Sequence, residues 1–369
     1  MRTPLLALSA VLVLGACAPR ADLVSPPPMS GDEAAAVRAG VDAFGALPAL
    51  SFDGVQNAFS GATKDWTVSW RVTSGPTAFG HATADGLDVA VMSVDGLVFE
   101  RAPEKYWMSE PSTEVAAKGM ADDEWARVYD QGVIDPARFF NPAVYAAALG
   151  EAMELAGVFD RPLPLPVDAG GARAHVVEVG DGTVRIAEDG TILAVEDVEV
   201  VGLDGSGVDF TGDVVPLDRP GVEDLRDDVL AEVATVGEVR WFDNIFSDVR
   251  QDGVDLDCDH RGTCTLKVKV TLEVEAEEKG VRFAFMVSFE GRAWVDDDNE
   301  GECSQRKKVE AGESATLSCK ARVRLSDGAD TWISGEGYAQ RAYAIYYGDV
   351  ADLTAAVADE AERILADLP

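Results

Sequence analysis

The stretch Trp66-Thr67-Val68-Ser69-Trp70-Arg71-Val72 alternates strictly between apolar and polar side chains. Successive side chains of a β-strand point to opposite faces of a sheet, so this period of two predicts a strand with one buried face. The same alternation returns in the second half of the chain, in Leu266–Val274 and Val281–Phe289. The sequence therefore predicts a protein built mainly from half-buried strands.

Turn and capping residues mark further elements around this strand. Leu87–Val94 is followed by Asp95-Gly96, a pair that tolerates positive φ and favours a two-residue hairpin turn. Asn141-Pro142 places an N-cap residue before a proline at the first helical position, which predicts a helix that Gly157 ends. We further expect a helix over residues 31–47, a strand over residues 105–108, a short helix over residues 122–129, and strands over residues 172–179, 184–187, 192–200 and 208–214.

Several short motifs in this order of elements resemble a known family. They are the hairpin block Val94–Phe99, Tyr106-Trp107, Trp125, Asp135–Phe140, Gly182–Ala187 and Asp209-Phe210-Thr211. Over about residues 31–215 the chain resembles the LppX/LprAFG family of actinobacterial lipoproteins, which are similar in fold to the LolA/LolB lipoprotein carriers. The resemblance implies a curved antiparallel half-barrel around helices, with an apolar cavity for acyl chains.

Aromatic and aliphatic residues of this first half are the candidates for the cavity wall. Large rings between a bent sheet and its helices ordinarily fill a core, and a lipid pocket has the same lining with its centre left empty. Both alternatives stay open at the level of sequence. Strand parity and helix faces select Val68, Trp70, Val89, Val91, Phe99, Trp107, Phe139, Val144, Leu149 and Met153 as the expected lining.

The second half of the chain is expected to form a β-rich domain. Residues 216–236 predict a linker helix, and residues 237–369 predict strands followed by a terminal helix that Asp349 caps. Strands with one apolar face favour an Ig-like sandwich or a compact α+β sheet. We expect the terminal helix to pack on this sheet, with the first domain as the alternative. The predicted fold class of the whole chain is α+β.

Cysteine usage indicates an oxidising compartment. Besides Cys17, the cysteines all lie in the last third of the chain, at Cys258, Cys264, Cys303 and Cys319. Four cysteines allow three pairings, and we expect the local ones, Cys258–Cys264 and Cys303–Cys319. A zinc site is the rival, but no spacing is C-x-x-C and the only histidine nearby is His260.

The N-terminus carries the most specific signal in the sequence. Arg2, the apolar run Leu5–Leu14 and the segment Leu14-Gly15-Ala16-Cys17 fit a lipoprotein signal peptide over residues 1–16. We expect Cys17 to accept diacylglycerol and palmitate, and the proline-containing residues 17–30 to form an extended tether. The predicted location is extracytoplasmic, with a lipid anchor in the cell membrane. An ordinary cleaved signal, with Cys17 incidental, is the alternative.

Composition and motifs limit the chemistry. The 66 acidic residues against 31 basic ones give a net charge of −35, which excludes nucleic acid as a partner and argues against docking on anionic lipid. No metalloprotease, serine-hydrolase or phosphate-loop motif occurs, so we expect no catalytic residues, cofactor or metal site. Two acidic loops, Asp255–Asp259 and Asp296–Gly301, lack EF-hand ligand geometry, and calcium binding there stays an open alternative.

Two functional hypotheses follow. The first is a non-enzymatic, lipid-anchored envelope protein that binds or shuttles a lipid or lipoglycan in an apolar cavity. The alternative is an interaction module with a filled first domain, whose C-terminal β domain binds an envelope protein or a cell-wall polymer. An open cavity would favour the first hypothesis, and an exposed apolar patch on the second domain would favour the second.

Overall fold

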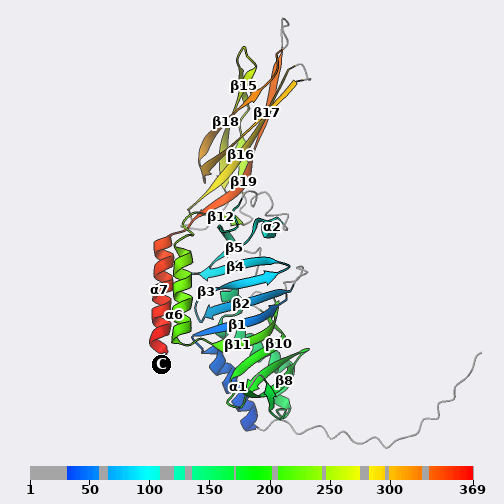
Figure 1. Cartoon of the computed structure of the whole chain (residues 1–369), viewed down its shortest axis with the longest axis vertical. Helices are drawn as coiled ribbons and strands as arrows, with labels where there is room; N and C mark the ends of the chain where they lie inside the picture. The colour runs from blue at the N-terminus through cyan, green and yellow to red at the C-terminus, as the bar shows by residue number, and fades with distance from the viewer. Residues whose placement is uncertain are drawn as a thin grey trace, which may run out of the picture.

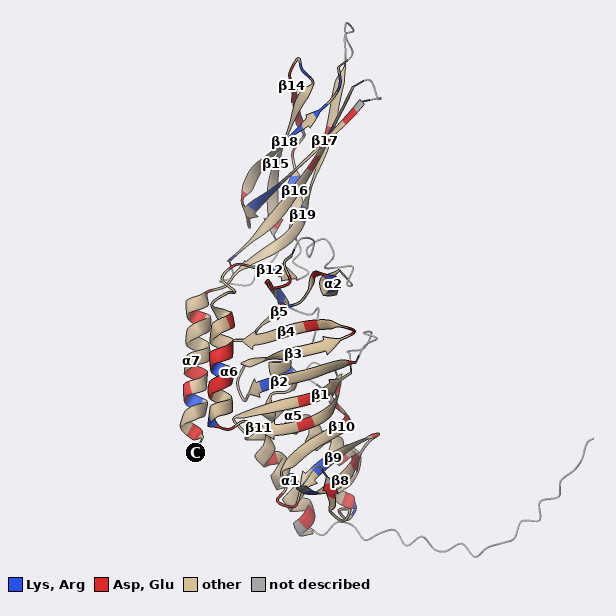
Figure 2. Cartoon of the chain, viewed as in Figure 1, with Lys and Arg blue, Asp and Glu red and all other residues tan. Residues whose placement is uncertain are grey.

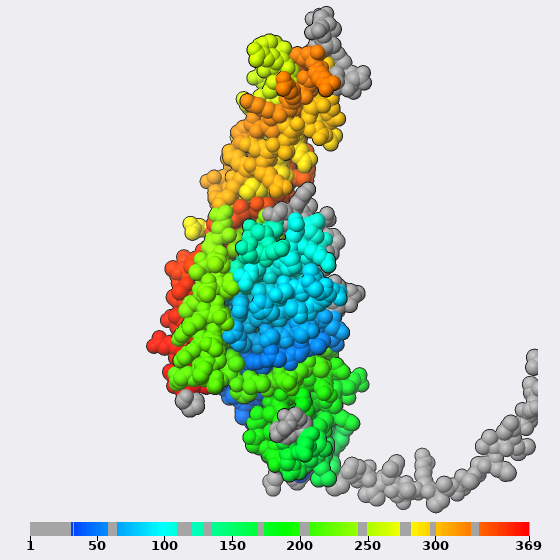
Figure 3. Space-filling model, in the orientation of Figure 1, coloured from blue at the N-terminus to red at the C-terminus, as the bar shows by residue number. Residues whose placement is uncertain are grey.

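The computed structural model describes residues 31–57, 65–108, 120–128, 135–169, 172–201, 207–242, 247–274, 282–295, 299–325 and 332–368. The expected signal peptide, the lipidation site Cys17 and the tether lie outside these ranges. The molecule is long and narrow, and its C-terminal half extends away from the end where α1 (Gly31–Gly45) begins (Figure 1, Figure 3). Most of the described chain forms strands of open sheets, with few helices, in agreement with the α+β prediction.

The described elements form two sheets and several helices. Besides α1, the helices are α2 (Glu104–Trp107), α4 (Pro136–Phe139), α5 (Pro142–Leu155), α6 (Arg219–Val233), α7 (Val350–Asp367) and the 3-10 turn η1 (Val158–Asp160). The large sheet has the order β17-β16-β19-β12-β6-β5-β4-β3-β2-β1-β11-β10-β9-β8-β7, and the small sheet contains β13, β15, β14 and β18. The first-half strands are β1 (Ala49–Gln56), β2 (Trp66–Thr73), β3 (Ala78–Ala84), β4 (Leu87–Val94), β5 (Leu97–Arg101), β6 (Trp125–Val128), β7 (Val167–Ala169), β8 (Ala172–Val179), β9 (Gly182–Ala187), β10 (Ile192–Val201) and β11 (Gly207–Pro216). The later strands are β12 (Val239–Phe242), β13 (Ser247–Gln251), β14 (Asp255–Cys258), β15 (Thr263–Val274), β16 (Arg282–Val295), β17 (Asn299–Glu310), β18 (Ser314–Arg322) and β19 (Ile333–Tyr347).

Local signals of the first half fold as the sequence predicts. Asp95 and Gly96 form the turn between β4 and β5, with φ of 51° and 76°. The Asn141 side chain accepts a hydrogen bond from the Ala143 N–H (3.1 Å) and caps α5. Gly157, with φ of 63°, follows the end of that helix. The strands expected over residues 66–72, 87–94, 172–179, 184–187, 192–200 and 208–214 correspond to β2, β4, β8, β9, β10 and β11.

Residues 105–108, expected as a strand, instead belong mainly to helix α2. One helical turn lets two aromatic side chains satisfy their polar atoms. The Tyr106 hydroxyl donates to the Glu100 carboxylate (3.0 Å), and the Trp107 indole N–H donates to the Ala102 carbonyl (3.1 Å). Buried aromatic residues with a polar atom need such partners, so tertiary contacts decide the local structure here.

Trp125–Val128, expected as part of a short helix, is strand β6. All four of its residues are buried, because β6 lies between β5 and β12 with both of its faces covered. A continuous apolar run of this length is compatible with a helix or with a strand buried on both faces. Tyr129, the other residue of that predicted helix face, lies outside the described residues.

The large sheet carries a hydrophobic core on each face. On one face α1, α4 and α5 cover the sheet, and rings such as Phe52 and Phe140 fill the space between them; we call this the first core. On the other face, Phe79 and Met92 belong to a second core with α6, α7 and the C-terminal half. The parallel pairing of β6 with β12 carries the sheet from one half of the chain into the other.

Helix α6, expected as a linker helix over residues 216–236, has its apolar side buried in the second core. Helix α7 lies beside α6 and contacts β4 (Figure 1). The terminal helix therefore packs on the first half, and the expectation that it packs on the C-terminal sheet is wrong. The buried carboxylate of Glu360 fixes this position, because it accepts hydrogen bonds from the hydroxyls of Thr73 and Thr77 (2.7 Å for Thr77). Asp349 caps α7 as expected, accepting from the Asp352 N–H (3.2 Å).

The C-terminal half is a sandwich, in agreement with the predicted one. Strands β12, β19, β16 and β17 face the small sheet, and side chains such as Phe285, Phe289, Leu266 and Val268 are buried together. The disulfide Cys258–Cys264 joins β14 to β15, and Cys303–Cys319 joins β17 of one sheet to β18 of the other. Both disulfide pairings expected from the sequence are confirmed.

Candidate functional site

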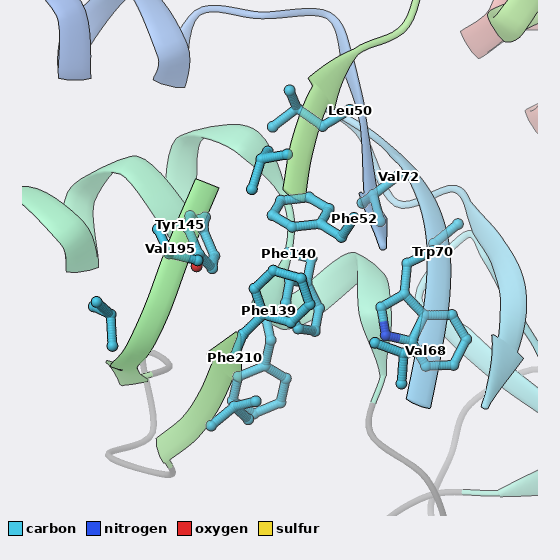
Figure 4. Packing of buried hydrophobic residues seen from close by; sticks show 14 of the residues in the cluster. Leu50, Phe52, Val68, Trp70, Val72, Phe139, Phe140, Tyr145, Val195 and Phe210 are labelled. Carbon is cyan, nitrogen blue, oxygen red and sulfur yellow. The ribbon is translucent and has the colours of Figure 1, made fainter. Parts of the chain in front are cut away.

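Eight of the ten residues expected to line a lipid cavity lie in the first core. They are Val68, Trp70, Val89, Val91, Trp107, Phe139, Leu149 and Met153, and all of them are buried. Figure 4 shows Trp70 and Phe139 close to the rings of Phe52, Phe140 and Phe210. The ring centroids of Phe52 and Phe140 are 4.8 Å apart, and those of Phe140 and Phe210 are 5.4 Å apart. Rings at these distances are in contact, so side chains occupy this part of the interior.

Phe99 and Val144 have other surroundings. Phe99 pairs with Met92 across the β4–β5 hairpin, so both side chains point to the face opposite Val91. Phe99 belongs to the second core, where its ring centroid is 6.2 Å from that of Tyr346. The prediction that Phe99 shares a cavity with Val91 is wrong. Neighbouring strand residues point to opposite faces, and Phe99 points to the face opposite Val91. Val144 is half-buried on α5, outside the first-core cluster.

A groove of about 790 Å³ opens where the first core ends, between α5 and strands β8–β11. Its apolar wall consists of Ala148, Ala152, Leu155 and Ala156 on α5, with Val179 at the end of β8 and Val198 on β10. Leu155 is 82% exposed, so the largest side chain of this wall on α5 is accessible to a ligand. Small-molecule sites have volumes of about 300–1,000 Å³, so this groove has the size of a ligand site.

Tyr145 lies on the same side of α5 as Ala152 and Ala156, nearer the start of the helix. Its hydroxyl is buried and has no hydrogen-bond partner among the described residues, and burial raises its pKa above the ordinary value for tyrosine. Figure 4 shows the Tyr145 oxygen beside Val195 of β10, the strand that continues to Val198 in the groove wall. A buried hydroxyl is ordinarily bonded to protein, water or a ligand. Tyr145 thus carries an unpaired polar atom inside the first core, and it is not among the residues that line the groove.

Carboxylates surround the mouth of the groove. They come from α5, the β8–β9 turn, β10 and β11, and are Glu151, Asp181, Asp197, Glu199 and Asp209. A bulge in β10 between Val195 and Val198 sets the position of Asp197, which has φ of 50°. The Thr211 hydroxyl holds this bulge, because it donates to the Asp197 carboxylate (3.0 Å) and accepts from the Asp197 N–H (2.9 Å). The bulge keeps Val195 and Val198 buried while Asp197 faces solvent.

Of the acidic loops weighed for calcium, Asp255–Asp259 is described and contains strand β14 followed by a turn. Among the described residues, no group of three or more His, Cys, Asp or Glu side chains is arranged to hold a metal ion. The Asp259 carboxylate accepts hydrogen bonds from the N–H groups of Thr263 (2.9 Å) and Arg261 (2.8 Å), which lower its pKa. Asp296 and Asp298 of the second loop lie outside the described residues.

The groove residues were not identifiable from sequence patterns. They come from α5, from the β8–β9 turn and from two strands, so no single window of sequence contains them. The available signal is on α5, where alanine recurs at 148, 152 and 156 in place of the larger side chains expected against a sheet. Small residues at one helix face leave room beside the helix, but a stripe of this kind also occurs where two backbones pack closely.

The disulfides Cys258–Cys264 and Cys303–Cys319 indicate an oxidising, extracytoplasmic environment. Within the described ranges, no helix combines the length and the apolar character needed to cross a membrane. No family model matches the chain, and no curated protein matches it. The groove, the sandwich and their surfaces are therefore the basis for a functional proposal.

Proposed function

We propose that this protein is an exported, lipid-anchored envelope protein that binds or shuttles an acyl-chain lipid in the groove between α5 and strands β8–β11. The observation that carries the proposal is the apolar wall of the groove, above all the exposed Leu155. Burying an acyl chain against this wall removes apolar surface from water, worth about 0.8 kcal/mol per methylene. Aromatic rings fill the interior of the first core, so we place the proposed site in the groove at its end.

The position of the groove fits a lipid source in the anchoring membrane. Gly45 of α1 lies against Ala146 of α5, and Arg38 forms an ion pair with Glu154 (2.7 Å), so the two helices are antiparallel. The start of α1 is therefore near the end of α5 that lines the groove. Residues 17–30 reach at most about 50 Å at about 3.5 Å per residue. An anchor on Cys17 would keep the groove within this distance of the membrane, with the sandwich farther away.

Calorimetry with monododecanoylglycerol tests the proposal on the full-length chain carrying Cys17→Ser. Leu155→Ser removes apolar wall without disturbing a core, and should weaken binding about tenfold, equivalent to about 1.4 kcal/mol. Leu165→Ser is the matched control, because Leu165 is 87% exposed and lies outside the groove. Absence of binding at about 1 mM lipid, or equal effects of the two substitutions, would overturn the proposal.

A second candidate function rests on exposed aromatic residues of the sandwich. Trp332, directly before β19, is 82% exposed, and Tyr338, at an exposed position of β19, is 63% exposed. Exposed rings of this kind are typical of surfaces that bind another molecule. The corresponding function is an interaction module for an envelope protein or a cell-wall polymer. Co-sedimentation with purified insoluble peptidoglycan tests the polymer: Trp332→Ser with Tyr338→Ser should abolish it, and absence of sedimentation by the unmodified chain would exclude it.

A further inference from the structure

The charge around the groove is not compensated. None of the five carboxylates at its mouth, Glu151, Asp181, Asp197, Glu199 and Asp209, forms an ion pair within the described part of the chain. Among the residues that the structure describes, no lysine or arginine lines the groove. The ribbon segments of Asp and Glu, red in Figure 2, include Glu178 of β8 and Glu196, Asp197 and Glu199 of β10 at this end of the molecule. The mouth is thus a region of negative potential beside an apolar wall.

The arginines closest to the groove are engaged with other groups. Arg38 pairs with Glu154 (2.7 Å) and Arg185 pairs with Asp213 (3.0 Å), and neither acid lines the groove. Arg161 donates to the backbone carbonyl of Ala156. Arg38 and Arg185 thus have acidic partners, whereas Arg161 brings one positive charge to the Ala156 end of the groove. The five lining carboxylates still leave the mouth with an excess of negative charge.

We propose that the groove selects amphiphiles with one acyl chain and a positively charged headgroup, and rejects anionic ones. The inference rests on the proposed lipid-binding function and adds the headgroup class. The chain lies against the alanine stripe and Leu155 of α5, and the headgroup lies among the carboxylates. An anionic headgroup would meet like charges on every side of the mouth, whereas a cation would form ion pairs with several of them.

The dimensions favour a lipid over a basic amphipathic peptide as the occupant. The apolar wall is one short stretch from Ala148 to Ala156, in which Leu155 is the only large side chain, with Val179 and Val198 opposite it. A helix with side chains is about 10–12 Å across, and it would need a wider apolar floor than this. A single acyl chain is thinner and follows the stripe of small residues.

Three probes with the same 12-carbon chain isolate the headgroup. They are dodecylamine, monododecanoylglycerol and laurate, each titrated below its aggregation concentration into the full-length Cys17→Ser chain. We expect dodecylamine to bind at least about tenfold more tightly than the neutral probe, and laurate at least about tenfold more weakly. Raising the ionic strength from about 0.01 M to about 0.1 M shortens the Debye length from about 30 Å to about 10 Å and should reduce the difference.

Two sets of substitutions that change the net charge equally distinguish the effect of the groove carboxylates from the effect of the protein's overall charge. Asp181→Asn, Glu199→Gln and Asp209→Asn together should remove most of the preference for dodecylamine over monododecanoylglycerol. Glu290→Gln, Glu313→Gln and Glu336→Gln change the net charge equally at exposed positions of the sandwich and should have no effect. These substitutions lie on surface side chains, so folding is checked by an unchanged circular dichroism spectrum.

The outcomes distinguish the two proposals. Equal affinity for all three probes would overturn the headgroup inference and keep the proposed lipid-binding function. Absence of binding by every probe would overturn both. Tighter binding of a basic amphipathic peptide than of dodecylamine, lost in the groove variant, would replace the lipid by a peptide and so contradict the inference. Equal effects of the groove and sandwich variants would assign the preference to the overall charge of −35.

Discussion

The two hydrophobic cores lie on opposite faces of one sheet and are closed in different ways. The first core is covered by α1, α4 and α5 and is filled with contacting rings. The second core is covered by α6 and α7, continues into the sandwich and is reinforced by disulfides. Strand β4 contributes to both, with Val91 in the first and Met92 in the second. The comparison shows that alternate residues of the same strand pack into different cores, so each core supports the strands that the other core also needs.

The largest expected effects come from substitutions that each remove a buried ring from one core, and they test whether the two cores unfold together. Trp70→Ala in the first core and Phe285→Ala in the second remove fully buried rings, and each should lower the free energy of unfolding by about 3–5 kcal/mol. Because β4–β6 carry side chains of both cores, we expect a single cooperative transition in either variant. Urea unfolding followed by circular dichroism, together with calorimetry, measures this. Two separate transitions would show that the cores are independent.

Disulfide removal should affect the second core alone. Cys303→Ser with Cys319→Ser opens a loop with a sequence separation of 16, and should cost about 3 kcal/mol. Cys258→Ser with Cys264→Ser opens a loop with a separation of 6 and should cost about 2 kcal/mol. Urea titrations of the two double variants give both values. The reverse order of the two losses would contradict the loop-entropy explanation.

The helical cover of the second core depends on one buried carboxylate. Glu360→Ala removes the acceptor of the Thr77 hydroxyl and one of the two acceptors of the Thr73 hydroxyl, and should lower the free energy of unfolding by about 2 kcal/mol. Glu362→Ala is the control, because Glu362 is exposed on the same helix and its loss should change stability by less than about 0.5 kcal/mol. Hydrogen exchange at the turn between β2 and β3 should rise in the first variant only. Equal stability of both variants would exclude this role for Glu360.

The smallest expected effects come from two tyrosines of the first core, and they have opposite signs. Tyr145→Phe removes an unpaired buried hydroxyl and should raise the free energy of unfolding by about 1 kcal/mol. Tyr106→Phe removes the donor to the buried carboxylate of Glu100 and should lower it by about 1 kcal/mol or more. Thermal unfolding of both variants measures the pair. A loss of stability in Tyr145→Phe would show that its hydroxyl has a partner.

Signals confined to a few neighbouring residues predict the local structure well. Asp95-Gly96 gives the hairpin turn and Asn141 gives the start of α5, because turn geometry and helix capping depend on adjacent residues. Cysteine spacing allows three disulfide pairings, and the local one that we expected is the one in the structure. The parity of Phe99 was also accessible, since a two-residue turn between Val94 and Leu97 places Phe99 opposite Met92.

Long-range pairing determines what the sequence patterns miss. Trp125–Val128 becomes a strand because β12, more than 100 residues later, pairs beside it. Helix α7 packs on β4 because Glu360 meets Thr73 and Thr77, which no local pattern links. The groove also depends on long-range contacts, since its lining residues come from α5 and from the later strands β8, β10 and β11. These features depend on tertiary contacts between distant segments.

The parallel pairing of β6 with β12 has a mechanical consequence. Three residue pairs, from Ala126–Arg240 to Val128–Phe242, connect the hydrogen-bonded strands of both halves. A force applied to the tip of the sandwich is therefore transmitted through the hydrogen-bonded strands of the large sheet to the groove end. Helices α6 and α7 lie along the side of this sheet (Figure 1). The short joint between β6 and β12 is where such a load should first cause rupture, which single-molecule stretching between the two ends would detect.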